Sequence, residues 1–278
     1  MLWRLDAAGD TLWTRTYALT GGVYIYSSCR TRDGGFALVG LLSNQTTGHQ
    51  QLLLLRTDSL GTLLWQRTYR WQAVNLGLSV GELPNGDLLL GGVTCDLGYY
   101  NQFTYLLRTD SLGTARWQRR LGTSGLDVNG AAIVCPLRDG GWAVVSSVGY
   151  PPPGTEQQLR LVVHRYSATD SLLWRREIGP KTHTGEAVSL LELPDGSLVG
   201  AGTSADSARA RPRGNGFPQG FVFKLCADGD SVWFRNHDLV PGWQSHNYLY
   251  GLSATPDGGF VGAGFVWAIA PDTGSDDA

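Results

Sequence analysis

Two glutamates occupy equivalent places in the sequence, each on an apolar stretch and three residues before a tight turn. They are Glu82, which precedes Asn85-Gly86, and Glu192, which precedes Asp195-Gly196. Hydrolysis of a glycosidic bond needs two carboxyl groups that face each other across the bond. Either glutamate is therefore a candidate catalytic group of a carbohydrate-active hydrolase, and the sequence does not identify its partner.

Aromatic side chains in the predicted loops form a second set of candidates. Such side chains stack on sugar rings or anchor a protein partner when they lie in a shallow pocket. Unlike the tryptophans that recur along the chain, these residues are not repeated, so packing within the repeat does not explain them. The candidate ligand-binding residues are Trp71, Tyr99, Tyr100, Phe103, Trp243 and His246.

Other reactive side chains are scattered. The five histidines and four cysteines show no CxxC or Cys/His spacing of the kind that binds a metal. The sequence therefore assigns no catalytic residue in the leading interpretation, and it predicts neither a metal site nor a cofactor.

The elements that position these residues come from an internal repeat. Leu52–Tyr69 reads LLLLRTDSLGTLLWQRTY and returns almost unchanged at Leu106–Leu121. An Asp that caps the turn and a Gly that takes positive φ are typical of a hairpin between two strands. A tryptophan recurs at a fixed place in the second of these strands, at positions Trp13, Trp65, Trp117, Trp174 and Trp233.

A second turn, Asp-Gly or Asn-Gly, follows each of these tryptophans between two more apolar runs. Four antiparallel strands in every 50 to 60 residues or so are typical of a β-propeller blade. Each Asp-Gly or Asn-Gly turn lies 32 to 38 residues before the next repeated tryptophan. If the C-terminus is followed directly by the N-terminus, the distance from Asp257 to Trp13 is 34 residues, which fits the same spacing.

This spacing predicts an all-β, five-bladed β-propeller in a single domain, 1–278, whose ring is closed by N- and C-terminal strands sharing one blade. The expected blades span about 23–69, 78–121, 131–178, 186–239, and 248–278 completed by 1–17. The loops after the second and fourth strands vary in length, and they would emerge on one face. Variable loops on a rigid scaffold are the expected binding face.

Composition narrows the possible partners. The formal net charge of −2 argues against binding to nucleic acid or to an anionic membrane. No stretch approaches the roughly 18 consecutive apolar residues of a transmembrane helix. We therefore expect a monomer without a nucleic-acid partner or membrane insertion. No signal peptide is visible, so the chain is expected to be either cytoplasmic or a mature piece of a secreted protein.

The run from Asp33-Gly34-Gly35 to Trp65 combines DGG with LxRxDxxGxxxW, and it has four counterparts along the chain. This combination resembles a repeat of secreted Bacteroidetes propellers, which often carry a C-terminal sorting domain for type IX secretion. The resemblance implies a secreted or cell-surface protein.

The leading functional interpretation is a non-catalytic recognition or scaffold module that binds glycan or protein through the variable-loop face. The alternative is a carbohydrate-active hydrolase that uses the inner-strand carboxylates. A structural spacer within a larger surface protein is the third possibility.

Overall fold

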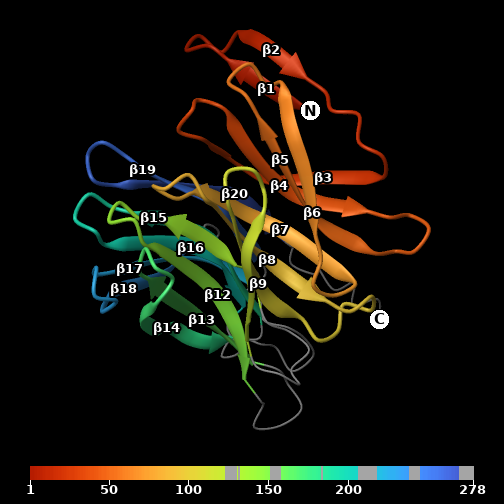
Figure 1. Ribbon diagram of the computed structural model, residues 1–278. Helices are drawn as coiled ribbons and strands as arrows, with labels where there is room; N and C mark the ends of the chain where they lie inside the picture. Colours follow the sequence, from red (N-terminus) through yellow and green to blue (C-terminus); the bar gives the residue numbers. More distant parts are fainter. Residues whose placement is uncertain are drawn as a thin grey trace, which may run out of the picture.

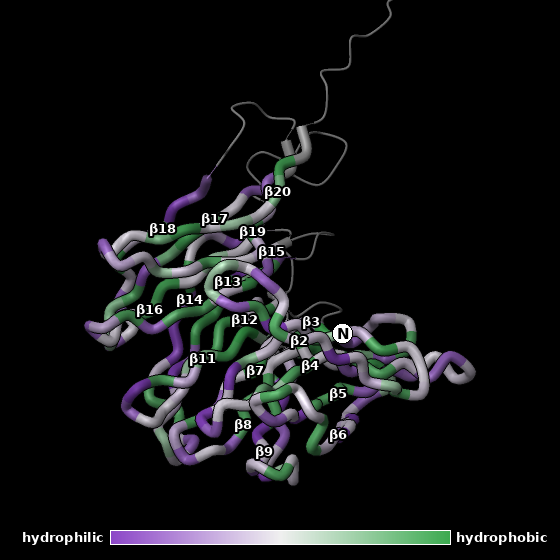
Figure 2. Tube along the Cα trace, turned by 90° about the horizontal axis from the view of Figure 1, so that it is seen from above, coloured by the Kyte–Doolittle hydropathy of each residue, from purple (hydrophilic) through white to green (hydrophobic). Residues whose placement is uncertain are grey.

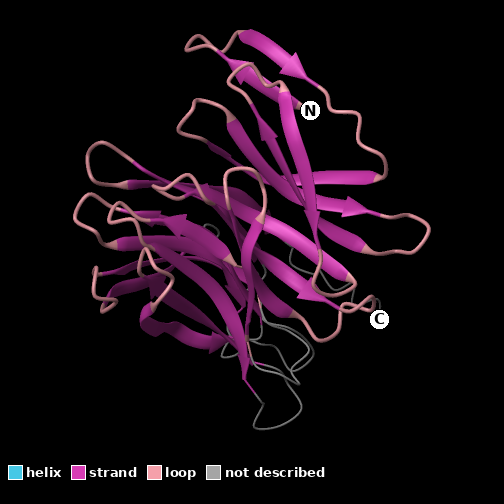
Figure 3. Ribbon diagram, viewed as in Figure 1, coloured by secondary structure: helices cyan, strands magenta, loops and turns pink. Residues whose placement is uncertain are grey.

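A computed structural model gives the fold of residues 1–122, 130, 132–150, 158–182, 184–205, 218–237 and 245–268, which are the residues the structure describes. Their regular elements are all β-strands, and no α-helix occurs among them (Figure 3). Within those ranges there is accordingly no helix long and apolar enough to cross a membrane. The prediction of an all-β chain is confirmed.

Four consecutive four-stranded units make up most of the structure, and each corresponds to one repeat of the sequence (Figure 1). The first unit contains β3 (Gly22–Arg30), β4 (Phe36–Ser43), β5 (Gln50–Thr57) and β6 (Leu63–Tyr69). The second contains β7 (Val74–Glu82), β8 (Leu88–Cys95), β9 (Phe103–Thr109) and β10 (Ala115–Leu121).

The third and fourth units repeat this plan. The third contains β11 (Ile133–Pro136), β12 (Trp142–Tyr150), β13 (Gln158–Tyr166) and β14 (Leu172–Thr182). The fourth contains β15 (Thr184–Glu192), β16 (Leu198–Ala205), β17 (Pro218–Leu225) and β18 (Ser231–His237). In every unit, consecutive strands pair in antiparallel fashion, so the short turns lie at one end and the variable loops at the other.

Apolar strand faces form the core between neighbouring units. Leu52 and Leu54 of the first unit pack with Leu88 and Leu90 of the second, and all four side chains are buried. Figure 2 shows the apolar segments along the strands and the polar segments at the turns. A parallel bridge between Gln50 and Val74 also joins the first two units into one eight-stranded sheet.

The repeated tryptophans lock each unit to the next one. A Cβ atom placed on Gly61, in the β5–β6 turn, would lie 2.6 Å from the Trp13 ring of the preceding hairpin. A Cβ atom placed on Gly113 would likewise lie 2.9 Å from the Trp65 ring, and one placed on Gly229 would lie 2.9 Å from the Trp174 ring. These turn glycines have positive φ and no side chain, so the indole lies directly on the turn. We call this the tryptophan–turn contact.

The third unit makes the same contact with an aspartate in place of the glycine. Asp170 has φ of 64° and accepts a hydrogen bond of 2.7 Å from Trp117 Nε1. Its carboxylate also accepts bonds from Trp142 Nε1 at 2.9 Å and from Arg108 Nη1 at 2.7 Å. Because Trp142 and Arg108 are buried, one carboxylate satisfies three donors at this interface.

Within each unit, a cation on the third strand pairs with an aspartate of the first turn. Arg56 lies 2.6 Å from Asp33, Arg165 lies 2.7 Å from Asp139, and Lys224 lies 3.7 Å from Asp195. In the second unit, Arg108 pairs with Asp87 at 2.8 Å instead, since that turn reads Asn-Gly-Asp. We call these contacts the turn ion pairs.

Two further hairpins lie at the ends of the chain. β1 (Leu2–Leu5) pairs with β2 (Thr11–Arg15), and β19 (Ser245–Ala254) pairs with β20 (Phe260–Ala268). Among the described residues, neither hairpin pairs with another strand.

The expected sharing of one blade by the two chain ends is therefore not confirmed by this structure. Each hairpin is held instead by the unit beside it in sequence. Tyr17 Oη donates to the Gly61 carbonyl at 2.8 Å, and Leu249 N donates to Thr203 Oγ1 at 3.2 Å.

Replacing Asp170 with glycine tests how much the carboxylate contributes. Asp170→Gly removes the backbone strain of a non-glycine residue at positive φ, but it leaves two indole N–H groups and part of the Arg108 guanidinium without an acceptor. We expect the free energy of unfolding to fall by about 2 to 4 kcal/mol. Denaturant unfolding measures this, with Asp228→Gly in the exposed equivalent turn as the control; equal small losses in both variants would contradict the role.

The first turn ion pair predicts a pH dependence of stability. Hydrogen bonds from Arg56, then from the Thr31 hydroxyl and the Gly35 N–H, lower the pKa of Asp33 from 3.8 to about 2. A lowered pKa stabilises the folded state above pH 3.8, and this contribution disappears as the pH falls toward 2. Because the Asp33 side chain is 62% exposed, we expect less than about 1 kcal/mol.

Urea unfolding of the unmodified protein and of Asp33→Asn at several pH values measures this difference. The two curves should separate above pH 3.8 and converge near pH 2. A separation that does not change with pH would contradict the assignment.

Candidate functional site

Tyrosines gather at the loop end, between the inner strand of the first unit and a loop of the second. Tyr24 and Tyr26 lie on β3 and are 59% and 51% exposed. Tyr99 lies in the β8–β9 loop and is 54% exposed. We call Tyr24, Tyr26 and Tyr99 the tyrosine surface. Three exposed rings on two rigid elements can offer both flat apolar faces and hydroxyl groups to a ligand.

The Tyr26 hydroxyl is close enough to those of Tyr24 and Tyr99 to interact with each of them electrostatically. Partial burial raises the pKa of Tyr26 above its ordinary value, and the phenols of Tyr24 and Tyr99 add to the rise. The Tyr26 hydroxyl, which is protonated at neutral pH even at its ordinary pKa, can donate a hydrogen bond. Gln50 Nε2 donates to Tyr99 Oη at 3.1 Å, which ties the loop of the second unit to β5 of the first.

The loop that carries Tyr99 has a defined conformation. Asp96 accepts hydrogen bonds from Gln72 Nε2 at 3.1 Å and from Asn101 Nδ2 at 2.8 Å. Tyr99 and Asn101 have positive φ values of 62° and 51°, a conformation that costs energy for a residue with a side chain. The loop thus holds Tyr99 in position at some conformational cost, as binding loops often do.

Two of the candidate aromatics form a separate cluster. The rings of Trp71 and Phe103 lie on the Arg120 guanidinium, with its carbon 4.9 Å and 4.5 Å from the ring centroids. Trp71 also packs edge-on against Tyr105 at 6.3 Å. The structure therefore brings Trp71 and Phe103 together around Arg120, and Trp71 stays 41% exposed.

The remaining candidates differ in what can be said of them. Tyr100 is exposed and its ring covers Gly98 in the same loop as Tyr99. His246 lies in β19 opposite Trp267, and the structure does not describe its side chain. Trp243 lies outside the described residues.

Sequence reasoning missed Tyr24 and Tyr26. A signal was available, because a Tyr-x-Tyr pattern occurs at corresponding places in β3 and in β19, where it comprises Tyr248 and Tyr250. The corresponding inner-strand positions of the second unit are leucines.

The inner-strand glutamates have structural partners. Glu82 Oε2 accepts a hydrogen bond of 2.7 Å from the Arg32 N–H of the preceding unit. Glu192 Oε2 accepts one of 2.9 Å from the Arg138 N–H, again in the preceding unit. Both carboxylates thus bind the first turn of a neighbouring unit, at the opposite end of the strands from the variable loops. Their expected role as catalytic groups is not supported by this placement.

The neighbouring thiols are also unsuited to nucleophilic chemistry. Burial raises the pKa of Cys29 to about 11 and that of Cys135 to about 12, and the charges of Glu82 and Glu192 add to these shifts. Both thiols remain protonated at neutral pH. In the part of the chain that the structure describes, no group of three or more His, Cys, Asp or Glu side chains is arranged to hold a metal ion.

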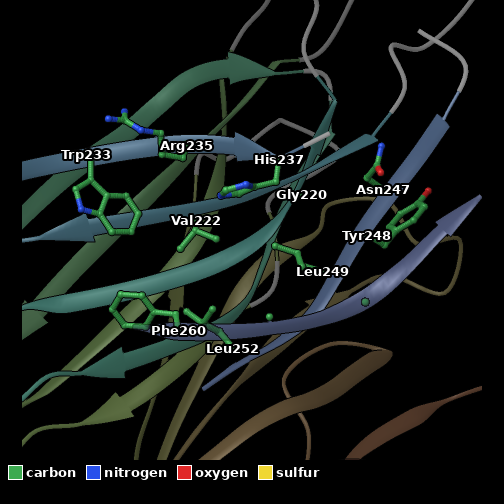
Figure 4. A pocket seen from close by; sticks show the side chains of 12 residues that line it. Gly220, Val222, Trp233, Arg235, His237, Asn247, Tyr248, Leu249, Leu252 and Phe260 are labelled. Atoms are coloured by element: carbon green, nitrogen blue, oxygen red, sulfur yellow. The ribbon is translucent and has the colours of Figure 1, made fainter. Parts of the chain in front are cut away.

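A cavity of about 560 Å³ lies between the fourth unit and the C-terminal hairpin (Figure 4). Strands β17 and β18 form one wall, and β19 and β20 form the other. Its volume is within the range of small-molecule sites. Its lining is mostly apolar, with the polar groups of Arg235, His237 and Asn247. Trp233, a repeated tryptophan, also faces this space (Figure 4).

No protein-family model matches the chain, and no curated protein matches it. Among solved structures, it is similar to a mutant apocarotenoid oxygenase from Synechocystis, with a TM-score of 0.53 and 12% identity over 96% of this chain and 62% of the oxygenase. An ulvan lyase of polysaccharide lyase family PL25 gives 0.50 and 10% identity, over 85% of this chain and 68% of the lyase.

An endo-arabinase from Bacteroides thetaiotaomicron gives a TM-score of 0.44 and 13% identity, over 90% of this chain and 98% of the arabinase. The chain spans less than two thirds of the oxygenase's length. At identities this low, the likeness to the oxygenase and the lyase concerns the fold alone.

These comparisons contradict the leading functional interpretation. The oxygenase and the ulvan lyase, which match most of this chain, are enzymes, so the prediction of a non-catalytic recognition or scaffold module is wrong. The carbohydrate-active alternative agrees better with them, although Glu82 and Glu192 are not placed to serve it.

The structural role of the glutamates can be tested directly. Glu192→Ala removes the acceptor of the Arg138 N–H, and we expect the free energy of unfolding to fall by about 1 to 3 kcal/mol. Glu186→Ala, on the same strand but exposed, is the matched control and should change it little. Unchanged stability in Glu192→Ala would show that the inter-unit bond contributes nothing.

Proposed function

We propose that this protein is a carbohydrate-active enzyme that holds a polysaccharide chain on the tyrosine surface. The observation that carries the proposal is the exposure of Tyr24, Tyr26 and Tyr99 at the loop end of an all-β scaffold. Sugar rings present apolar C–H faces and hydroxyl edges, and tyrosine offers a complementary ring and hydroxyl. The likeness to a polysaccharide lyase in fold supports the carbohydrate class.

The tyrosine hydroxyls have a chemical role in this proposal. Like any tyrosine, Tyr26 is protonated at neutral pH, and the rise of its pKa strengthens this preference, so its O–H donates to a sugar hydroxyl or to a carboxylate of an acidic sugar. Gln50 and the Asp96-centred loop hold the Tyr99 ring in place before the substrate arrives. Preorganised donors of this kind stabilise charge that develops on the substrate.

The finer architecture and the location are part of the same proposal. The fold is a five-bladed propeller, with the four observed units as four blades and the two terminal hairpins as the fifth. The location is extracellular or at the cell surface, where the enzyme would encounter polysaccharides. The repeated units and the resemblance of DGG…LxRxDxxGxxxW to secreted propellers support these statements.

The activity is tested with purified protein on a panel of neutral and acidic polysaccharides. New reducing ends alone indicate hydrolysis, and new reducing ends with the ultraviolet absorbance of an unsaturated uronate indicate a lyase. We expect Tyr99→Ala to raise KM by roughly tenfold, since the stacking of a sugar ring on the tyrosine ring contributes about 1 to 2 kcal/mol. Tyr26→Phe keeps the ring but removes the donor, so kcat/KM should fall as well.

Tyr166→Phe is the matched control, because this buried tyrosine lies in the third unit, away from the surface. The proposal fails if a folded protein cleaves no polysaccharide in the panel. It also fails if cleavage occurs and the Tyr26 and Tyr99 variants retain full activity.

A further inference from the structure

From the geometry of the cavity beside Trp233 we infer that it is the docking site of the chain's own N-terminal hairpin, β1–β2. Docking places β1 against β20 and completes a fifth four-stranded unit. The inference rests on the five-bladed architecture proposed above, and it adds the contacts that hold the fifth blade. Three sets of contacts repeated elsewhere in the structure define where the hairpin would lie.

The first set is the tryptophan–turn contact. Trp13, Trp65, Trp117 and Trp174 each lie on the turn of the following unit. Trp233 occupies the same strand position in the fourth unit but lines the cavity. The matching turn glycine is Gly9, with φ of 89°, and none of the described residues lies within 4 Å of a Cβ atom placed on it. Docking would place Gly9 on the Trp233 ring.

The second set comes from the residues two and four positions after Trp13 and Trp65. Arg15 and Arg67 lie along the same turn glycines, 2.8 Å from the added Cβ atom. Tyr17 Oη and Tyr69 Oη donate to the carbonyls of those glycines, at 2.8 Å and 2.5 Å.

The corresponding side chains of the fourth unit are Arg235 and His237, and both line the cavity (Figure 4). An imidazole N–H can replace the tyrosine hydroxyl as the donor to the Gly9 carbonyl. The counterparts of the three side chains that hold the Gly61 and Gly113 turns therefore all line this cavity.

The third set is the turn ion pair. Arg165 of the third unit binds in two directions, with Nη2 on Asp139 at 2.7 Å and Nη1 on the Ala227 carbonyl of the next unit at 2.6 Å. Arg4 holds the same place in β1 and already makes the second bond, to the Ser59 carbonyl at 3.2 Å. The aspartate that corresponds to Asp139 is Asp257, in the β19–β20 turn. Docking would form an Arg4–Asp257 ion pair.

The surfaces to be joined are apolar and exposed. Trp3 of β1 is 61% exposed, while Leu55, at its place in the first unit, is 1% exposed. Val261 of β20 is 59% exposed, while its counterpart Ala37 is fully buried. The two hairpins also carry the unpaired strand edges, which are costly to leave open. Docking would pair the open strand edges and bury the exposed apolar side chains.

A reciprocal charge exchange tests the Arg4–Asp257 contact. Arg4→Asp and Asp257→Arg should each lower the unfolding midpoint, and the double variant should recover part of the loss, because the bonds of Arg4 to Ser59 and of Asp257 to its own turn stay broken. The expected coupling is roughly two- to fivefold in the unfolding equilibrium constant. Arg4→Asp combined with Asp228→Arg, an exposed aspartate in another turn, is the control and should show no recovery. Additive losses in the Arg4–Asp257 pair would overturn the contact.

A glycine series tests the Trp233 contact independently. Valine at Gly61 meets the Trp13 ring, whereas valine at Gly86 (φ of 84°) meets no described atom within 4 Å and reports backbone strain alone. If the hairpin docks, Gly9→Val should destabilise as much as Gly61→Val, and Trp233→Ala should remove the excess. If Gly9→Val matches Gly86→Val, the docking is wrong.

Sedimentation of the same samples identifies the occupant. Coupling in a monomer supports docking of the chain's own hairpin, and coupling that appears with dimer formation would overturn it in favour of exchange between two copies. These readouts measure stability and mass. A loss of polysaccharide cleavage without loss of coupling would therefore count against the proposed function and not against the docking.

Discussion

The contact between a tryptophan and the turn of the next unit is the interaction on which the whole arrangement depends. Each indole needs a turn without a side chain, which is why glycine with positive φ recurs at Gly61, Gly113 and Gly229. The contact fixes the separation and the angle between neighbouring sheets. The buried leucines between those sheets can then pack closely, because their backbones are held at a constant spacing.

The one exception to the glycine rule shows what the contact requires. Asp170 accepts the same backbone conformation and replaces van der Waals contact with hydrogen bonds to Trp117 and Trp142. Its carboxylate also neutralises part of Arg108, which would otherwise be a buried charge with Asp87 as its main partner. A departure from the repeat is thus matched by a compensating set of partners.

Much of the fold could be predicted from the sequence, because the turns and the tryptophans repeat with a regular spacing. The units and their strand order follow from Asp-Gly turns and from alternating apolar residues, which are local signals. The partners of Glu82 and Glu192 could not be predicted, since they are backbone N–H groups about fifty residues away. Tyr24 and Tyr26 were missed because tyrosines on an inner strand are usually assigned to the core, and here a β-bulge after Ile25 accompanies their exposure. The joining of the chain ends also depends on contacts between distant residues, which spacing alone does not determine.

The stabilising contacts lie at one end of the strands, and the exposed tyrosines lie at the other. The tryptophan–turn contacts, the turn ion pairs and the glutamate bonds all lie at the end with the short turns, while the tyrosine surface and the variable loops lie at the other. Substitutions, insertions and deletions in the loops therefore leave these three sets of contacts untouched. Such a division lets the recognition surface diverge during evolution without a matching loss of stability. A change within one loop therefore has local effects, whereas a change in one short turn affects two neighbouring units.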